Sequence, residues 1–189
     1  MKIIQICGTN GVGKTTLVKN LLASGNFMKM SQAVEGVSKE FWFDGRVAVV
    51  GKYNDRNCCG VDAGNYSGDV LIKTISAIIA LYRPAVLLFE DVRFGGNFTF
   101  KQKMKTFADG VGYDYYLLAL FASLECSCNR VLNRSGNIDA DYDAMRSKAR
   151  GVIKSTKKAG EIGAKVFFCD TEKNDKAAVL RRLKMVIDD

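Results

Sequence analysis

Residues 8–15 read Gly-Thr-Asn-Gly-Val-Gly-Lys-Thr and match the pattern G-x-x-x-x-G-K-[ST] at every fixed position. An apolar run over residues 2–7 precedes this segment and predicts a buried strand. Leucines and a valine at helical spacing follow it over residues 14–23. Glycines in such a loop allow backbone N–H groups to turn toward phosphate oxygens, and the helix N-terminus adds its dipole. The segment therefore predicts a phosphate-binding loop (P-loop) between a strand and a helix, which takes ATP or GTP with Mg²⁺.

The side chains of this loop have separate expected parts in binding the nucleotide. Lys14 is placed to reach the β- and γ-phosphates, and the hydroxyl of Thr15 is placed to ligate Mg²⁺. A glycine turn with a chance Lys-Thr pair is the alternative, and the order of strand, loop and helix argues against it. The residues expected to contact the nucleotide are Asn10, Gly11, Val12, Gly13, Lys14, Thr15 and Thr16.

The rest of the chain alternates between strand-like and helix-like segments, which implies right-handed crossovers and a parallel sheet. We expect a three-layer α/β P-loop NTPase fold with a mostly parallel five-stranded sheet and helices on both faces. Residues 27–40 are ambiguous and are interpreted as a helix followed by a loop, whereas Asp44-Gly45 signals a hairpin turn. We predict strands at residues 47–52, 85–89, 115–121 and 165–169, and helices at 69–81, 99–108, 123–133, 139–159 and 175–187. The helix at 99–108 carries the basic cluster Lys101, Lys103 and Lys105.

The size and the apolar pattern limit how the chain is organised. A length of 189 residues fits one domain, residues 1–189, with an insert at about 26–68 and a short lid at about 130–140. No apolar run approaches the ~20 residues that span a bilayer, so we expect a soluble, cytoplasmic protein without a membrane partner.

The chain contains no histidine, and this excludes several kinds of site. Ser-His and Cys-His dyads, histidine zinc ligands and imidazole bases are all ruled out, so proton removal must use a carboxylate, Lys, Tyr or Cys. The six cysteines include Cys58-Cys59 and Cys126-x-Cys128, which lack the paired C-x-x-C spacing of zinc sites. We expect the cysteines to be reduced and structural.

The net charge of +8 is concentrated near the C-terminus. Residues 146–184 contain twelve lysines and arginines and only four carboxylates, which accounts for the whole excess. Such a segment suits a polyanionic partner, and a solvated helical face is the alternative.

A second acidic element follows the apolar strand at residues 85–89, which leads into Glu90-Asp91. Ligands of open α/β sheets bind at the carboxyl edge of the strands, beside the predicted phosphate loop. Glu90 is expected to orient a Mg²⁺-bound water, with Asp91 as the alternative for this part. A carboxylate that caps the next turn is the structural alternative.

Arg130 and Arg134 lie four residues apart, so on the predicted helix they share a face just before the expected lid. Two guanidinium groups over the nucleotide would stabilise charge that develops on a transferred phosphoryl group. A solvated helix face is again the alternative. Arg146 and Arg150 form a second, weaker pair beyond the lid.

The phosphate loop alone does not distinguish a kinase from a GTPase, so the motifs elsewhere in the chain indicate the class of reaction. A GTPase needs a base-reading N-K-x-D motif, which Lys173-Asn174-Asp175 does not form. A small kinase needs a carboxylate near the end of the second main strand to accept the proton of the acceptor hydroxyl. Asp55 and Asp62 both follow that strand, and Asp62 is favoured because Gly60 and Gly64 lie close by. An aspartate in a local turn is the alternative.

These motifs together resemble the nucleoside monophosphate kinase group of P-loop kinases. More narrowly, Val49-Val-Gly-Lys-Tyr53 followed by Cys59-Gly-Val-Asp62 resembles phage-encoded kinases that phosphorylate the hydroxymethyl group of 5-hydroxymethyluracil in DNA. The chain departs from that family where Cys-Gly-Gly-Cys-Asp would be expected at residues 58–62, and at Asp91-Val-Arg93. The resemblance implies Lys14 and Thr15 for phosphate and Mg²⁺, Asp62 as base, Glu90 as the acid of the third strand, and Arg130 and Arg134 as lid arginines.

The resemblance implies an ATP- and Mg²⁺-dependent phosphotransferase of DNA hypermodification, with DNA as partner, in the cytoplasm of a phage-infected host. The basic segment would hold the DNA backbone, and aromatic side chains would stack on the base, although core packing is expected for at least half of them. A kinase of a free nucleoside monophosphate is the alternative, and a nucleotide-switched module without kinase activity is the third reading. The aromatic residues concerned are Phe41, Trp42, Phe43, Tyr53 and Tyr66.

Overall fold

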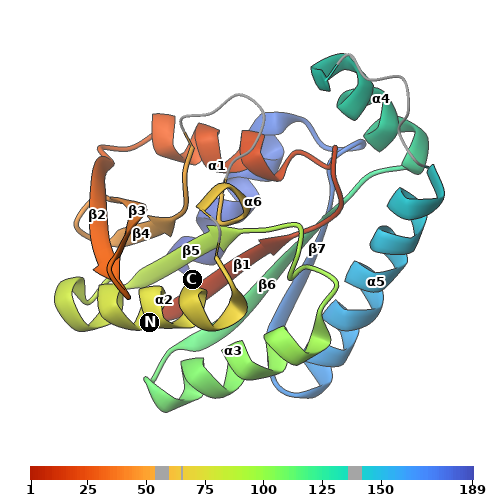
Figure 1. Cartoon of the computed structure of the whole chain (residues 1–189). Helices are drawn as coiled ribbons and strands as arrows, with labels where there is room; N and C mark the ends of the chain where they lie inside the picture. The colour runs from red at the N-terminus through yellow and green to blue at the C-terminus, as the bar shows by residue number, and fades with distance from the viewer. Residues whose placement is uncertain (54–59, 65, 136–141) are drawn as a thin grey trace.

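The computed structural model describes residues 1–53, 60–64, 66–135 and 142–189, and for Arg134 and Ser135 it describes the backbone only. Within these residues the chain forms a three-layer α/β fold around a single sheet (Figure 1). The predicted fold class is therefore confirmed. No helix in the described part of the chain is long and apolar enough to cross a membrane.

The sheet has seven strands in the order β2-β3-β4-β5-β1-β6-β7. The five strands from β4 to β7 in this order run parallel to one another, as predicted from the alternation of strands and helices. The carboxyl ends of all five meet at one edge. The strands are β1 (Lys2–Cys7), β2 (Met28–Val34), β3 (Val37–Phe43), β4 (Val47–Val50), β5 (Val86–Glu90), β6 (Asp114–Phe121) and β7 (Lys165–Asp170).

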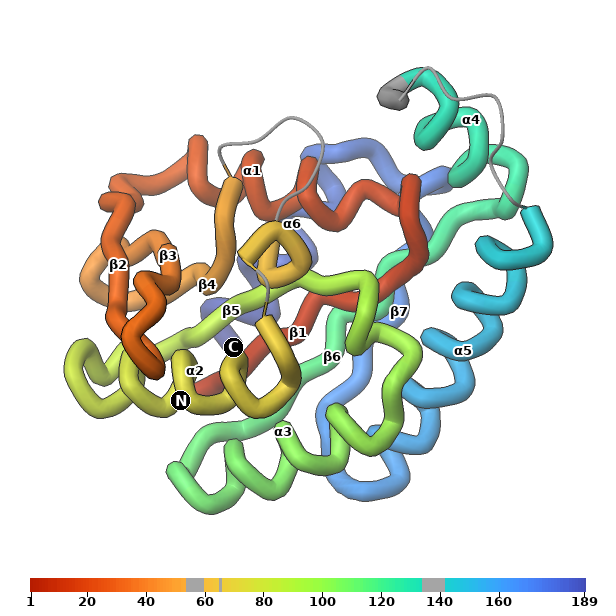
Figure 2. Tube along the Cα trace, viewed as in Figure 1, coloured from red at the N-terminus to blue at the C-terminus, as the bar shows by residue number. Residues whose placement is uncertain are grey.

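Helices cover both faces of the sheet, and each face has its own apolar core (Figures 1 and 2). One face is covered by α2 (Gly68–Tyr82), α3 (Phe98–Gly110) and α5 (Tyr142–Glu161), and we call it the α3 face. The other is covered by α1 (Lys14–Ala23) and α6 (Lys176–Asp188), and we call it the α1 face. Helix α4 (Leu124–Ser135) follows β6 and packs on α5, and a short 3-10 helix, η1 (Asp62–Gly64), precedes α2.

The prediction of five strands was too low because residues 27–40 form a hairpin rather than a helix and a loop. Strands β2 and β3 pair antiparallel, and β3 pairs antiparallel with β4. Glu35 (φ 51) and Gly36 (φ 77) form a two-residue turn between them, with the left-handed geometry of tight hairpins. The turn between β3 and β4 was predicted correctly, since Asp44 Oδ1 accepts hydrogen bonds from the N–H groups of Arg46 and Val47.

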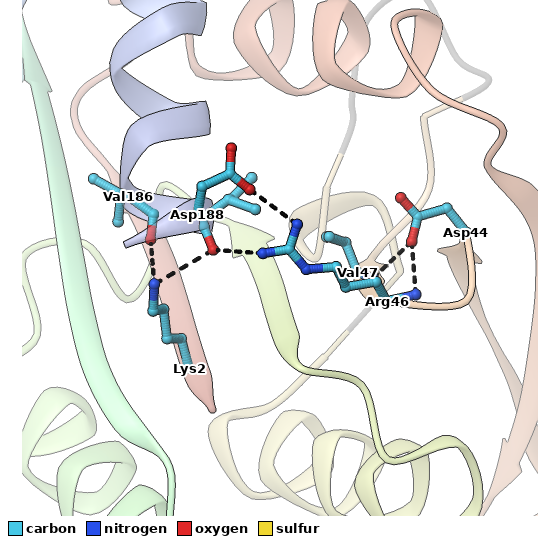
Figure 3. A network of polar contacts seen from close by, with 7 residues as sticks. Lys2, Asp44, Arg46, Val47, Val186 and Asp188 are labelled. Atoms are coloured by element: carbon cyan, nitrogen blue, oxygen red, sulfur yellow. Dashed lines mark hydrogen bonds and ion pairs between the residues drawn. The ribbon is translucent and has the colours of Figure 1, made fainter.

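The amino edge of the sheet is held by the C-terminus of α6 (Figure 3). Lys2 Nζ donates to the carbonyl of Val186 at 2.9 Å, and Arg46 Nη1 binds the carboxylate of Asp188 at 2.9 Å. Because this edge is closed by its own chain, the carboxyl edge, where the predicted phosphate loop lies, is the edge to search for a site.

The basic C-terminal segment does not form one surface. Its two helices, α5 and α6, lie on opposite faces of the sheet, and β7 lies between them in sequence. The expectation of a single flank over residues 146–184 is therefore corrected, because α5 packs on the α3 face before β7 and α6 packs on the α1 face after it (Figure 1).

Candidate functional site

The predicted phosphate loop lies between β1 and α1, and its glycines are required by its backbone. Gly11 has a φ of 78°, and a Cβ atom there would lie 2.1 Å from the carbonyl oxygen of Ser127 in α4. Gly13 has a φ of 90° and lies in open space, so only its left-handed conformation excludes other residues. No side chain caps the N-terminus of α1, which leaves its first N–H groups available for an anion.

Lys14 lies inside the loop and is 6% exposed. Its Nζ donates to the carbonyl oxygens of Gly8 at 2.9 Å and Thr9 at 2.7 Å. Burial lowers the pKa of Lys14, and the neighbouring carboxylate of Glu90 opposes that shift. The ammonium is thus held at the floor of the loop, where bound phosphates would give it better partners than two carbonyl groups.

Glu90 and Thr15 face each other across this loop. The hydroxyl of Thr15 donates to Glu90 Oε1 at 2.8 Å, while Glu90 Oε2 is buried and has no hydrogen-bond partner among the described residues. Glu90 is only 2% exposed, and burial raises its pKa to about 7 although Lys14 and the Thr15 hydrogen bond favour the charged form. A buried carboxylate with one orphaned oxygen is an unfavourable arrangement unless a further positive group binds to it.

This pair fits the Mg²⁺ ion that the loop implies. Mg²⁺ is usually held by one or two protein ligands, with phosphate oxygens and water filling its other positions. One hydroxyl and one carboxylate with a free oxygen, Thr15 and Glu90, match that donor set. Within the described residues no group of three or more His, Cys, Asp or Glu side chains forms a metal site independent of a nucleotide.

These groups line one cavity of about 770 Å³ at the carboxyl edge of the sheet. Strand β5 lies on one side of β1, and β6 and β7 lie on the other, so the cavity extends from the phosphate loop in two directions. Its lining comprises residues 10–17 and Asn20 at the loop and α1; Asp62, Glu90, Val92 and Arg93 on the β5 side; and Arg130, Thr171, Asn174, Lys176 and Val179 on the β7 side.

Asp62, the favoured base, lies in the cavity at the start of η1. Its Oδ2 accepts a hydrogen bond from the N–H of Val92 at 2.8 Å, and its Oδ1 accepts one from Arg93 Nε at 3.0 Å. Gly60, two residues earlier, packs closely on Glu90, since a Cβ on Gly60 would lie 2.7 Å from Glu90 Cγ. Asp62 and Glu90 therefore face the same space from two elements. Asp55, the other candidate base, lies outside the described residues.

Asp91 does not share this site, so the alternative assignment of Asp91 to the metal is wrong. Gln5 Nε2 donates to Asp91 Oδ2 at 2.6 Å, and Gln5 lies between Ile4 and Ile6, which both point to the α1 face. Because side chains alternate along a strand, Gln5 and Asp91 point to the α3 face instead. Burial raises the pKa of Asp91 to about 6, but Asp91 is not among the residues that line the cavity.

Lys101 lies in the same part of the α3 face and is fully buried. Its Nζ donates to the carbonyl of Gly95 at 2.5 Å and to the hydroxyls of Ser155 at 2.7 Å and Thr156 at 2.9 Å. The grouping of Lys101 with Lys103 and Lys105 as one basic cluster is therefore incorrect. Lys101 instead ties the loop after β5, which carries Arg93, to helix α5.

Of the two arginines predicted to serve the lid, only Arg130 has a described side chain. Arg130 lies in the cavity lining, where its guanidinium donates to the carbonyl and hydroxyl of Thr171 at 2.9 and 3.1 Å and to the carbonyl of Gly11 at 3.4 Å. It thus bridges the phosphate loop and the segment after β7. Arg134 lies in the last turn of α4, and its side chain is outside the described part of the chain. A contact of either with phosphate stays a prediction.

Most of the aromatic residues expected near the acceptor belong to the core. Phe41 and Tyr66 are buried on the α3 face, and Tyr53 is buried on the α1 face. Phe43 and Trp42 are partly buried against the same two cores. Their alternation with other apolar residues along β3 and β4 already favoured core packing.

Sequence reasoning did not assign a role to Arg93 or Thr171. Arg93 binds Asp62 in the cavity, and Thr171 accepts hydrogen bonds from Arg130. The position of each directly after a parallel strand was an available signal, because such residues gather at the carboxyl edge. The four described cysteines, Cys7, Cys126, Cys128 and Cys169, are free thiols, and Cys58 and Cys59 lie outside the described residues.

Known structures share this fold across nearly the whole chain. YorR from Bacillus subtilis, in complex with phosphorylated GDP, has 10% sequence identity and a TM-score of 0.61 over 99% of this chain and 96% of that one. A gluconokinase from Sinorhizobium meliloti 1021 has 13% identity and a TM-score of 0.52 over 99% and 91%. A deoxyadenosine kinase from M. mycoides with bound dCTP has 13% identity and a TM-score of 0.51 over 99% and 100%.

No protein-family model matches the sequence, and no curated protein matches it significantly. At 10–13% identity the structural likeness concerns the fold. The chain has the fold of P-loop kinases, and its activity has to be argued from the residues of its own cavity.

Proposed function

We propose that the protein transfers the γ-phosphoryl group of ATP, with Mg²⁺, to a hydroxyl acceptor. The observation that carries this proposal is that Lys14, Thr15, Glu90 and Asp62 line one cavity of about 770 Å³. A phosphate loop and a metal-binding carboxylate suit any P-loop NTPase. A second carboxylate, held in place on the β5 side of that cavity, is what an acceptor hydroxyl requires.

The strand order supports one orientation of the nucleotide in the cavity. Its phosphates occupy the loop at the centre of the cavity, and its base extends toward Thr171 and Val179 on the β7 side. The γ-phosphate then points toward Glu90 and Asp62 on the β5 side. The two ends of the cavity therefore serve as donor side and acceptor side.

Each side chain has a distinct part in the transfer. Lys14 exchanges the carbonyls of Gly8 and Thr9 for the β- and γ-phosphates. Thr15 and Glu90 would hold Mg²⁺, which would supply positive charge to balance the charge on the transferring group. Asp62 is oriented by the N–H of Val92 and by Arg93. It accepts the proton of the acceptor hydroxyl while the oxygen of that hydroxyl forms a bond to the γ-phosphorus. The bond from that phosphorus to the β–γ bridging oxygen breaks, and ADP leaves.

For the acceptor we propose the hydroxymethyl group of 5-hydroxymethyluracil in DNA. The sequence resemblance supports this choice, and so does the net charge of +8, because a DNA substrate requires cations beyond the active site. The cytoplasm of a phage-infected host would be the corresponding location.

A free nucleoside monophosphate is the second candidate acceptor. Arg93 supports it, because its side chain is 50% exposed and lies in the cavity lining beside the candidate base, where it suits an acceptor phosphate. Nucleotides bound to YorR and to the deoxyadenosine kinase are consistent with this class of ligand in the fold.

The test offers γ-labelled ATP and Mg²⁺ with three acceptors in parallel: DNA that contains 5-hydroxymethyluracil, the same DNA with thymine, and free nucleoside monophosphates. Label in the hydroxymethyluracil DNA alone supports the leading proposal, and label only in free nucleotides replaces it by the second. ATP hydrolysis with no labelled acceptor would leave a nucleotide-switched module. Asp62→Asn should abolish transfer with ATP binding retained, while Asp69→Asn, at an exposed aspartate of α2, serves as the matched control.

A further inference from the structure

Helix α5 presents a row of cations along its solvent-facing side. The opposite side of the helix packs on the sheet through Met145, Val152 and Ala159, which are buried. The cations follow one another three or four residues apart, or about 5–6 Å along the helix axis. This α5 row comprises Arg146, Arg150, Lys154 and Lys157, all exposed, with Lys158 at its margin.

The row is poorly neutralised by the protein itself. The only carboxylates of the helix, Asp143 and Glu161, lie near its two ends. Among the described residues, Arg146 is 3.7 Å from Asp143, and Arg150, Lys154 and Lys157 take part in no described ion pair. Like charges at i, i+4 destabilise a helix, so this arrangement costs stability unless an anion binds.

Helix α5, which carries the row, packs on β6 and β7, and its middle contacts the loop after β5. A Cβ atom added to Gly96 would lie 3.7 Å from the carbonyl carbon of Gly151, so the loop after β5 lies against the middle of α5. Lys101 joins the same two segments through Gly95 and Ser155. That loop also carries Arg93, which binds Asp62, so the loop connects α5 with the acceptor end of the cavity. Helix α6, with its own lysines and arginines, lies on the α1 face.

We propose that the α5 row binds the sugar-phosphate backbone of a nucleic acid strand, one base of which enters the cavity as acceptor. This inference takes the acceptor base from the proposed function on which it rests, and it adds the surface that binds the nucleic acid strand. The row from Arg146 to Lys157 spans about 16 Å. One strand carries a phosphate about every 3.4 Å of duplex axis, so the row faces about five phosphates.

The residues between the cations favour this partner over a membrane. A helix that lies on a lipid surface presents a broad apolar face to the bilayer. The large apolar side chains exposed on α5 are Ile153, 41% exposed, and Tyr142, 46% exposed at its first turn. A narrow row of cations with little apolar surface suits a linear chain of phosphates.

Two triple variants with equal loss of charge test the surface. The α5 variant carries Arg150→Gln, Lys154→Gln and Lys157→Gln, and the α6 variant carries Arg181→Gln, Arg182→Gln and Lys184→Gln. Binding of labelled single- and double-stranded DNA is measured by fluorescence anisotropy from 50 to 200 mM salt. Circular dichroism checks that each variant is folded.

The α5 variant should lower the DNA association constant at least tenfold at the lower salt concentration. It should also reduce the magnitude of the slope of log K against log salt by about 2–3, since each lost phosphate contact contributes about 0.9. The α6 variant should change the slope by less than about 0.5. An equal or larger loss in the α6 variant would overturn the proposal, as would binding to phosphatidylserine vesicles that depends on α5 when DNA binding does not.

The outcome separates this surface from the choice of acceptor. DNA binding that depends on α5, without transfer of label to any DNA, supports the surface and overturns DNA as acceptor. Transfer to DNA that is equally efficient in the α5 variant at low protein concentration overturns the surface and leaves the proposed activity standing.

Discussion

The two faces of the sheet each hold a buried lysine close to a buried carboxylate, and the two carboxylates are consecutive residues. On the α1 face Lys14 lies near Glu90, and on the α3 face Lys101 lies near Asp91. Burial lowers the pKa of both lysines, and it raises the pKa of Glu90 to about 7 and of Asp91 to about 6. By burial and electrostatics alone, the two clusters are hard to tell apart.

They differ in what their charged groups can still bind. Lys101 uses its three donor positions on Gly95, Ser155 and Thr156, within a closed contact between a loop and α5. Glu90 and Asp91 each keep one buried oxygen without a hydrogen-bond partner among the described residues, but only Lys14 and Glu90 line the cavity. A shifted pKa marks a candidate site only together with access to a ligand, and we infer that the α1-face cluster is chemical and the α3-face cluster structural.

Replacing Lys14 should show the largest effect on chemistry. Lys14→Met should slow phosphoryl transfer by about 10³-fold, because it removes a cation aimed at the transferred phosphates. The free energy of unfolding should change by less than about 1 kcal/mol, since the two carbonyls that it leaves face the cavity and can bind water. Transfer kinetics and urea unfolding of the same preparation check both parts. A loss of unfolding free energy larger than the increase in the activation free energy of transfer would contradict the assignment of Lys14 to the chemistry.

Replacing Lys101 should show the opposite profile. Lys101→Met removes three buried hydrogen bonds and one of the two lysines whose charge favours ionised Asp91, so the free energy of unfolding should fall by about 3 kcal/mol. Lys103→Met, on the same helix but exposed, should cost less than about 0.5 kcal/mol. Chemical denaturation measures both variants. Equal stability of the two would show that the buried network contributes nothing.

The neighbouring carboxylates sharpen the comparison with nearly isosteric changes. Glu90→Gln should lower Mg²⁺-dependent transfer by about 100-fold, because the amide is a poorer ligand for a hard cation. Asp91→Asn should leave transfer within about threefold, since its side chain lies on the other face and binds Gln5. Steady-state rates over a range of Mg²⁺ concentrations provide the test. A greater loss from Asp91→Asn is the result that the assignment cannot accommodate.

The smallest predicted effect concerns pH. Mg²⁺ binds the ionised carboxylate, and with a pKa of about 7 Glu90 is largely protonated at pH 6 and largely ionised at pH 8. Binding of Mg·ATP should therefore release a proton at low pH and tighten about tenfold from pH 6 to pH 8. The dependence should be much weaker in Glu90→Gln and unchanged in Asp91→Asn. Calorimetry in buffers of different ionisation enthalpy measures the affinity and the proton released.

Contiguous features of the sequence predicted the donor half of the site. The phosphate loop is one segment whose glycines, lysine and threonine act on neighbouring atoms, so its motif carries its own geometry. Glu90 follows a strand that pairs directly with β1, and the parallel pattern was enough to bring it to the loop. The alternation of strand-like and helix-like segments also predicted the parallel sheet and the α/β fold class.

The remainder depended on contacts between distant segments. The turn at Glu35-Gly36 was missed because glutamate seldom occupies a left-handed position, although it has a φ of 51° here. Asp91 was one residue from Glu90 in sequence, yet strand alternation sends it to the other face. Lys101 looked like one of three surface lysines, and only packing against Gly95 and Ser155 shows it to be buried.

The most direct test of the central claim is a calorimetric titration of Mg·ATP into the wild-type protein, Lys14→Met and Lys101→Met at a temperature where all three are folded. We predict one site per chain in the wild type, an affinity at least about 100-fold weaker in Lys14→Met, and an affinity within about threefold of wild type in Lys101→Met. Absence of binding by the wild type, or equal loss in the two variants, would contradict the claim that the α1-face cavity alone binds the nucleotide.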